Sequence, residues 1–261
     1  MITPSGEQRA VIEAPLTPMR VAAGAGTGKT TTIALRVVHL VKVHGLEPER
    51  ILGITFTNKA AAELADRIRR HLAGVVDPGR EAEIHTYHGF AAQLLREFGA
   101  LVGMERRAQV ITPTFSRQLL TGVIASTPLP AISIASRGVV EDLRRFGSML
   151  GDHLLEPAEV RIPDYEPGAP WELRADLVRG LLAYQTEKRR LGVADYSDLV
   201  VLAHRLAIQF PEVAAEIRGR YQAVMLDEYQ DTNPAQREFL RVLFPDGFSV
   251  TAVGDVDQTI Y

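Results

Sequence analysis

The segment from Ala23 to Thr30 reads A-G-A-G-T-G-K-T, and these residue types at this spacing can hold a triphosphate. In such a loop, successive backbone N–H groups and the N-terminus of the following helix bind phosphate oxygens. We expect Lys29 to reach the β- and γ-phosphates and Thr30 to ligate Mg²⁺. Ala23 stands where the common form of the motif has glycine, and alanine at this position is a known variant. The residues predicted to bind the nucleotide here are Ala22, Ala23, Gly24, Ala25, Gly26, Thr27, Gly28, Lys29, Thr30 and Thr31.

A second candidate group is the carboxylate pair Asp227 and Glu228, which directly follows the apolar run Val224-Met225-Leu226. Parallel sheets place their ligands at the C-terminal ends of strands. We expect Asp227 to hold Mg²⁺ together with Thr30, and Glu228 to accept a proton from the attacking water. The simpler explanations are a glycine-rich turn without a ligand and an acidic strand-end cap. The presence of both motifs in one chain favours a nucleotide site.

The elements that must position these groups follow from the hydrophobic pattern. Up to residue 89, short β-branched runs alternate with helical stretches, which predicts a parallel sheet with right-handed crossovers. The pattern then becomes helical until about residue 208, and Pro/Gly-rich stretches at 127–130 and 163–170 interrupt it. The predicted strands are Met19–Ala22, Ile51–Thr55, Glu83–Thr86, Ala223–Leu226 and Ser249–Val253, and the main helices cover about Lys29–His44, Asn58–Leu72, Phe90–Phe98, Thr114–Ile124 and Leu173–Arg190.

The composition is that of a globular protein, because 46% of the 261 residues are apolar and 23% are charged. The sequence has no cysteine, which excludes disulfides, thiolate zinc sites and iron–sulfur clusters. It has neither a run of ~18 apolar residues nor a signal-peptide pattern. We therefore expect a cytoplasmic protein with no membrane partner. A net charge of −3 still allows a local basic track for nucleic acid, although the arginine clusters are also typical of solvated helix faces.

The acidic strand end continues as D-E-Y-Q-D-T from Asp227 to Thr232, and here the sequence resembles the N-terminal part of superfamily 1 DNA helicases of the UvrD/Rep/PcrA type. Tyr229 stands where that family usually has phenylalanine. Five further blocks follow the order of the family. They are P-S-G-E-Q at 4–8, I-T-F-T-N-K-A-A at 54–61, T-Y-H-G-F at 86–90, D-Y-S-D-L at 195–199 and V-G-D-V-D-Q-T-I-Y at 253–261.

The resemblance implies roles for residues outside the phosphate loop. Gln8 lies where the family reads adenine, so ATP is the expected nucleotide. Gln258 lies where an amide senses the γ-phosphate, which makes it a third catalytic candidate beside Lys29 and Glu228. Taken alone, Phe56 would be a core residue and His88 a structural histidine, but the blocks favour DNA contacts. The residues expected to bind single-stranded DNA are Phe56, Thr57, Asn58, His88 and Tyr261.

Elementary chemistry supports these DNA roles. Phe56 and Tyr261 are aromatic platforms on which unpaired bases can stack. Thr57 or Asn58 is a natural N-cap for the next helix, whose N-terminus can bind a phosphate. One departure concerns Thr31, because several family members have arginine at this position and no direct arginine contact to the nucleotide is expected from it here.

The resemblance also implies the fold and the domains. We expect an α/β fold, in which a P-loop NTPase (RecA-like) parallel sheet has helices on both faces and carries a mainly helical inserted subdomain. The RecA-like ATP-binding domain is expected to comprise residues 1–89 and 209–261, and the inserted subdomain residues 90–208.

The implied function is that of the ATP-binding half of a DNA helicase. Such an enzyme couples ATP hydrolysis to 3′-to-5′ translocation on single-stranded DNA and to unwinding at single-strand/double-strand junctions, in DNA repair or replication restart. The sequence ends at Tyr261, inside the last block. We therefore expect a fragment that lacks the second RecA-like domain and its phosphate-contacting arginines, and that hydrolyses ATP weakly.

Two other functions fit the same blocks. A helicase–nuclease subunit of the RecB/AddA kind shares them, and only a downstream nuclease motif would identify it. A non-catalytic, nucleotide-gated DNA-binding module is the alternative outside the enzymes. The presence of Lys29, Thr30, Asp227 and Glu228 argues against that module, although half of a site does not prove turnover.

Overall fold

The computed structural model describes residues 3–77, 79–104, 109–132, 138–162 and 171–255. The chain divides into two compact units. The first, here called the sheet unit, consists of Met1–Ala91 and Ala207–Tyr261, and the second, the helical unit, consists of Ala92–Leu206. None of the helices in the described ranges combines the length and apolar character that crossing a membrane requires.

A five-stranded sheet forms the centre of the sheet unit, and its strand order is β1-β7-β6-β2-β3. Every neighbouring pair is parallel, so all five C-terminal ends lie along one edge of the sheet. This confirms the predicted parallel α/β sheet. The strands are β1 (Met19–Ala22), β2 (Ile51–Thr55), β3 (Glu83–Thr86), β6 (Ala223–Leu226) and β7 (Val250–Gly254).

Helices and short 3-10 turns connect these strands. Those of the sheet unit are α1 (Gly6–Glu13), α2 (Lys29–Lys42), η1 (Pro48–Arg50), α3 (Asn58–Leu72), α9 (Pro211–Arg220), η4 (Tyr229–Asp231) and α10 (Pro234–Leu243). Two further helices, α4 (Tyr87–Phe98) and α8 (Tyr196–Gln209), begin in one unit and end in the other.

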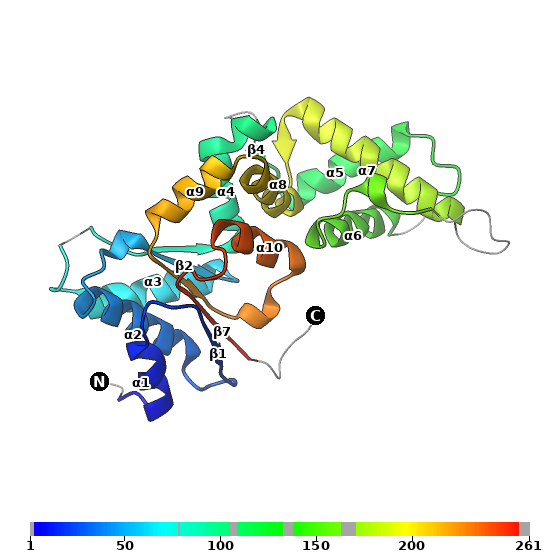
Figure 1. The fold of residues 1–261 in the computed structure, drawn as a ribbon. Coiled ribbons are helices and arrows are strands. Elements are labelled where there is room, and N and C mark those ends of the chain that lie inside the picture. The colour runs from blue at the N-terminus through cyan, green and yellow to red at the C-terminus, as the bar shows by residue number, and fades with distance from the viewer. Residues whose placement is uncertain (1–2, 78, 105–108, 133–137, 163–170, 256–261) are drawn as a thin grey trace. The chain divides into compact units, whose positions relative to one another are not determined.

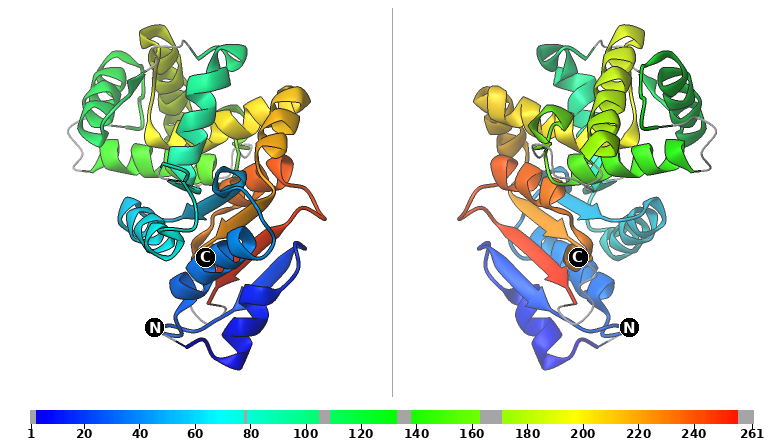
Figure 2. Two further views of the ribbon diagram at one scale, coloured as in Figure 1. Left: turned by 90° about the vertical axis from the view of Figure 1, so that its left-hand side faces the viewer. Right: turned by 90° about the vertical axis from the view of Figure 1, so that its right-hand side faces the viewer.

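Helices cover both faces of the sheet, as predicted. On one face, α2 and α3 share an apolar core with Met225 of β6. The next residue, Leu226, is equally buried on the opposite face, because successive side chains of a strand point to opposite sides. That face is covered by α9 and α10 (Figures 1 and 2). Burial on both sides explains why β6 reads as a continuous apolar run in the sequence.

The helical unit has an apolar core of its own. Leu120 of α5, Leu143 of α6 and Leu181 of α7 lie at its centre. A small parallel pair, β4 with β5, was not predicted, because two-residue strands have no periodicity to detect. The elements confined to this unit are η2 (Gly99–Val102), β4 (Gln109–Val110), α5 (Pro113–Ser126), α6 (Val139–Asp152), η3 (Pro157–Glu159), α7 (Trp171–Leu191) and β5 (Val193–Ala194).

Candidate functional site

The predicted phosphate loop connects β1 to α2 and has the backbone that an anion site needs. Gly26 and Gly28 have φ angles of 73° and 83°, in the left-handed region that glycine adopts without strain. Thr27 Oγ1 donates to the carbonyl of Gly24 at 2.8 Å and so braces the loop from within. Gly28 is the N-cap of α2 and has no side chain, so the N–H groups of the first helical turn stay available for a phosphate.

The structure brings the loop and the acidic strand end together. Thr30 Oγ1 donates to Asp227 Oδ2 at 3.0 Å across 197 residues of sequence. Lys29 Nζ and Glu228 Oε2 form an ion pair of 2.9 Å. These four residues meet because the phosphate loop and α2 follow β1, whereas Asp227 and Glu228 follow β6, and β7 alone separates the two strands in the sheet.

The backbone at Glu228 is in a conformation that non-glycine residues seldom adopt. Its φ and ψ angles are 50° and 43°, and its N–H donates to Asp227 Oδ1 at 3.0 Å. Such strain costs of order 1–3 kcal/mol and concentrates at functional sites. Here it ends the strand abruptly and turns the Glu228 side chain toward Lys29.

The two adjacent carboxyls differ in their environment. Burial raises the pKa of Asp227, against the lowering effect of the hydrogen bond from Thr30. Burial acts in the same direction on Glu228, but hydrogen bonds from Gln230 and Lys29 outweigh it and bring its pKa below the ordinary value. Glu228 therefore stays ionised at neutral pH, which is the state a proton acceptor requires.

The donor set fits Mg²⁺ held jointly with a nucleotide. Asp227 is 2% exposed and its carboxylate adjoins the Thr30 hydroxyl. Within the described residues, no three His, Cys, Asp or Glu side chains are grouped so that they could hold a metal ion by themselves. Mg²⁺ commonly binds through one or two carboxylates, water and substrate phosphates, so a site with a single buried aspartate suits it.

Gln230 takes part in the site, although the sequence predicts no role for it. Its Nε2 donates to Glu228 Oε2 at 2.8 Å, and its Oε1 accepts from the N–H of Asp255 at 2.9 Å. Gly254 permits this close approach, because a Cβ there would lie 2.8 Å from Gln230 Oε1 and 3.1 Å from the Gln230 backbone nitrogen. The D-E-x-Q spacing was the only signal in the sequence. Gln230 thus connects the predicted proton acceptor to the end of β7.

Gln8 lies beside the phosphate loop. Its Nε2 donates to the carbonyl of Thr27 at 2.8 Å, and its Oε1 accepts from the N–H of Ser5 in the N-terminal capping box of α1. Gln8 therefore joins α1 to the loop.

Thr31 is engaged through its hydroxyl, which accepts a hydrogen bond from Arg67 of α3. That arginine was also missed, because 36 residues separate the two positions.

The predicted DNA residues follow the neighbouring strands β2 and β3, whose last residues Thr55 and Thr86 are paired in the sheet. Phe56 is 45% exposed at the end of β2. Thr57 is the N-cap of α3, and its side chain accepts from the N–H of Ala60 at 3.1 Å. The sequence predicts Thr57 or Asn58 as the N-cap, and Asn58 is the first residue of the helix.

His88 is in the first turn of α4, and burial lowers its pKa. The adjacent Tyr87 is buried, and its hydroxyl lies 3.2 Å from Thr232 Oγ1. This contact joins the block after β3 to the block after β6 and was not anticipated. Gln258 and Tyr261, the other two predicted site residues, lie outside the described residues.

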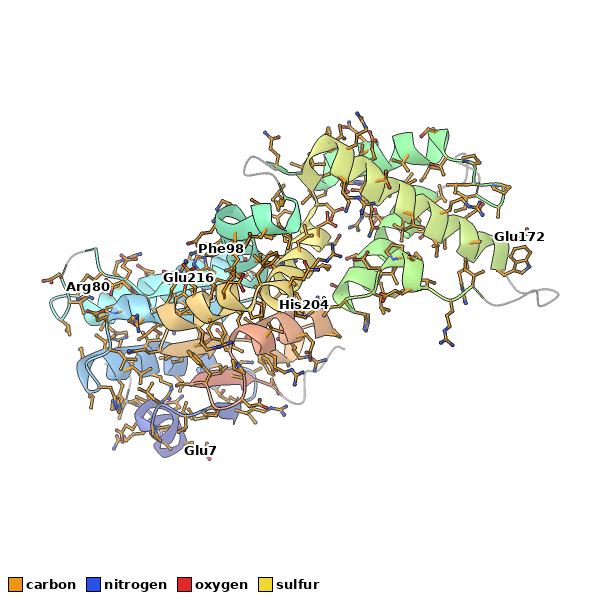
Figure 3. The ribbon with its side chains drawn as sticks, turned by 45° about the horizontal axis from the view of Figure 1, so that its top comes forward. Glu7, Arg80, Phe98, Glu172, His204 and Glu216 are labelled. Carbon is orange, nitrogen blue, oxygen red and sulfur yellow. The ribbon has the colours of Figure 1, made fainter. Side chains whose placement is uncertain are left out.

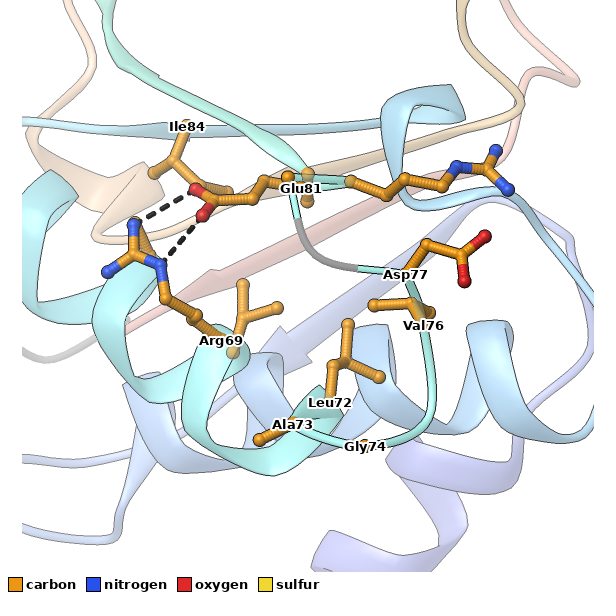
Figure 4. Close-up of a pocket in the computed structure, with 13 residues that line it drawn as sticks. Arg69, Leu72, Ala73, Gly74, Val76, Asp77, Glu81 and Ile84 are labelled. Carbon is orange, nitrogen blue, oxygen red and sulfur yellow. Dashed lines mark hydrogen bonds and ion pairs between the residues drawn. The ribbon is translucent and has the colours of Figure 1, made fainter.

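A separate pocket of about 380 Å³ lies at the C-terminal end of α3 (Figure 4). Arg69 and Glu81 both line it and are joined by two hydrogen bonds of 2.7 and 2.9 Å. None of the site residues predicted from the sequence lines it. The lining residues are Ala65, Ile68, Arg69, Leu72, Ala73, Gly74, Val76, Asp77, Gly79, Arg80, Glu81, Ala82 and Ile84.

Comparison with known proteins gives consistent matches. Residues 5–261 match the family described as the UvrD/REP helicase N-terminal domain. A protein of Leuconostoc citreum named ATP-dependent DNA helicase PcrA is 32% identical over 257 residues, which are 98% of this chain and 33% of that protein. DNA helicase II of Salmonella typhimurium is 31% identical over 255 residues, 98% of this chain and 34% of that protein. The chain thus spans about a third of the length of these relatives.

Proposed function

Because the chain belongs to the UvrD/REP helicase family, we propose that it binds ATP with Mg²⁺ and single-stranded DNA as the ATP-binding part of a DNA helicase. The observation that carries the proposal is the meeting of Lys29 and Thr30 of the phosphate loop with Asp227 and Glu228 of β6. Each of the four supplies a group that phosphoryl transfer to water needs.

The proposed chemistry assigns one task to each group. The N–H groups at the start of α2 hold the phosphates, and Lys29 neutralises charge on the β- and γ-phosphates. Thr30 and Asp227 hold Mg²⁺, which screens the phosphate charge when bound. Glu228 orients the attacking water and accepts its proton. Lys29 must leave Glu228 to reach a phosphate, so nucleotide binding frees the carboxylate for this task.

The proposed DNA track runs along the ends of β2 and β3. Phe56 offers an exposed ring for base stacking, and the N-terminus of α3 offers N–H groups for a backbone phosphate. His88 is placed at the corresponding end of β3. In this proposal the sheet unit is the RecA-like ATP-binding domain and the helical unit is its insertion. A complete enzyme would add a second RecA-like domain and move 3′-to-5′ along DNA, in repair or replication restart.

Single-strand binding to the chain tests the DNA half of the proposal. Phe56→Ala is expected to weaken binding of a fluorescein-labelled oligothymidylate by ~1–3 kcal/mol, read as fluorescence anisotropy. Phe115→Ala is the matched control, because Phe115 of α5 is 44% exposed and Phe56 is 45% exposed. Equal losses in the two variants would contradict the assignment. A salt titration with a slope near zero would remove the phosphate track altogether.

Nucleotide binding tests the other half. The chain is expected to bind a fluorescent ATP analogue more tightly with Mg²⁺ than without it, and Thr30→Val is expected to remove this difference. A Mg²⁺ effect that survives in Thr30→Val would show that the metal is held elsewhere.

A further inference from the structure

Arg36 of α2 is fully buried, with 0% of the residue exposed. Arginine is almost never buried to this extent unless it is paired. Here the acceptors that the structure gives to the guanidinium are uncharged oxygens. Nε donates to Thr251 Oγ1 of β7 at 3.0 Å, and the two terminal nitrogens donate to backbone carbonyls. The helix that carries Arg36 is the one whose N-terminus forms the phosphate site.

The carbonyls belong to the end of α1 and the residues that follow it. Nη1 donates to Val11 and Ala14, both at 2.8 Å, and Nη2 donates to Pro15 at 3.0 Å. The last carbonyls of a helix have no partner within the helix, and the helix dipole makes this end attractive to a cation. The last turn of α1 contains no basic residue of its own. Arg36 therefore supplies the C-terminal cap of α1 from a neighbouring helix.

α1 packs along α2, yet little of its own surface is buried. Ile12 is the single buried residue of this eight-residue helix. Glu7 points away from the rest of the sheet unit (Figure 3). At the opposite end from the cap, Gln8 donates to the carbonyl of Thr27 in the phosphate loop. A shift of α1 would therefore move Gln8 relative to the site of the phosphates.

We propose that Arg36 is a positioning residue, which holds α1 so that Gln8 can read the base of a nucleotide whose phosphates lie at the start of α2. The inference rests on the proposed function, because it takes Gln8 as the adenine-reading residue. Lysine could not replace Arg36, because a single ammonium cannot reach Thr251 and the four carbonyls of Val11, Ile12, Ala14 and Pro15 as a planar guanidinium does.

The test separates base recognition from phosphate binding. Isothermal titration calorimetry with the 261-residue chain and Mg²⁺ gives the dissociation constants of ATP, GTP and inorganic tripolyphosphate. In Arg36→Lys, the ratio of the GTP to the ATP constant is expected to fall about tenfold, whereas the tripolyphosphate constant changes less than about twofold. A merely structural role would weaken all three ligands together.

Arg218→Lys is the matched control. Arg218 of α9 also donates to carbonyls at the end of a helix, Leu243 at 2.9 Å and Val242 at 3.3 Å in α10, but it lies outside the nucleotide site. This variant is expected to keep the ratio of the unmodified chain. If Arg36→Lys does not fold, Thr251→Val takes its place, because it removes one acceptor and keeps the side-chain shape. It is expected to lower the ratio about twofold.

Gln8→Ala distinguishes failure of the inference from failure of the proposed function. If Gln8→Ala lowers the ratio and Arg36→Lys does not, or if Arg36→Lys weakens all three ligands equally, the role of Arg36 is wrong and base reading by Gln8 stands. If the unmodified chain shows no preference for ATP, or if Gln8→Ala leaves the preference intact, base reading by Gln8 is wrong and the inference fails with it. An unchanged ratio in Thr251→Val, where that variant replaces Arg36→Lys, also overturns the inference.

Discussion

Lys29 in the sheet unit and Lys188 in the helical unit are both largely buried lysines paired with carboxylates, yet the two pairs are built differently. Among the described residues the ion-pair partner of Lys29 is Glu228, whose side chain is 36% exposed and which belongs to a strained turn. Lys188 donates to Asp195 at 3.0 Å and to both oxygens of Asp198 at 2.7 Å. It also lies 4.6 Å from the centre of the Tyr184 ring.

The difference shows which ion pair can open. The Lys29 pair lies beside the uncapped N-terminus of α2, where a phosphate would offer the lysine a stronger partner. The Lys188 pair is closed by further bonds, since Tyr184 donates to Asp195 Oδ2 at 3.0 Å and Asp195 caps the start of α8 through the N–H of Asp198. We infer that the first pair serves binding and the second holds α7 to α8.

The largest expected effect comes from breaking the ion pairs of Lys188. Lys188→Ala leaves two carboxylates without their cation, which should lower the free energy of unfolding by ~3–5 kcal/mol. Trp171, the only tryptophan, is in α7, so its fluorescence in urea follows the helical unit. Lys59→Ala removes an exposed lysine and is expected to change stability by less than ~0.5 kcal/mol. A change as small in Lys188→Ala would contradict the structural role.

The next effect concerns binding at the first pair. Lys29→Ala is expected to weaken ATP binding about 100-fold, or ~3 kcal/mol, because the β- and γ-phosphates lose their ammonium. Its effect on unfolding should stay under ~1 kcal/mol, since the lost ion pair is partly exposed. Calorimetric titration and urea unfolding measure the two quantities. Lys42→Ala, at the other end of α2, is the control. A large loss of stability with unchanged affinity for ATP would show that Lys29 has a structural role and does not bind phosphate.

Releasing Lys29 from its ion pair should change the affinity for ATP by less, and in the opposite direction. In Glu228→Gln the lysine no longer leaves an ion pair to bind phosphate, so ATP affinity is expected to rise up to about fivefold. Any hydrolysis should fall, because the proposed proton acceptor is gone. Glu216→Gln on α9, which removes the partner of Arg220 in a 2.7 Å pair, serves as the control and should change neither quantity. Weaker ATP binding in Glu228→Gln would show that the ion pair does not compete with phosphate.

The smallest expected effect depends on pH. Burial raises the pKa of Asp227, so its contribution to stability is present at low pH and is lost as the pH rises through that raised pKa. The side chain in Asp227→Asn is neutral at every pH. The free energy of unfolding of this variant, relative to that of the unmodified chain, should therefore increase as the pH rises from about 4 to 7, by less than ~1 kcal/mol. Urea unfolding at several pH values measures this, with the exposed Asp66→Asn as control. A difference that does not vary with pH would contradict the burial effect.

The sequence by itself determined the elements and motifs that depend on local order. The limits of β1, β2, β3 and β6 were predicted to the residue, and those of α3 approximately, because periodicity, β-branched runs and caps act over a few neighbouring residues. The motifs of the loop at 23–30 and of the carboxylates after β6 could likewise be recognised in the sequence. The roles given to Gln258 and Tyr261 remain predictions from the sequence.

Only the tertiary structure decided which residues share a site. The strand order β1-β7-β6-β2-β3 brings Thr30 to Asp227 and places Gln230 against Gly254. No role was predicted for Arg36, whose acceptor on β7 is 215 residues away. Such contacts are set by packing across the sheet, and no pattern within one segment encodes them. That is the physical reason why the candidate motifs could be recognised along the chain, whereas the residues that position them could not.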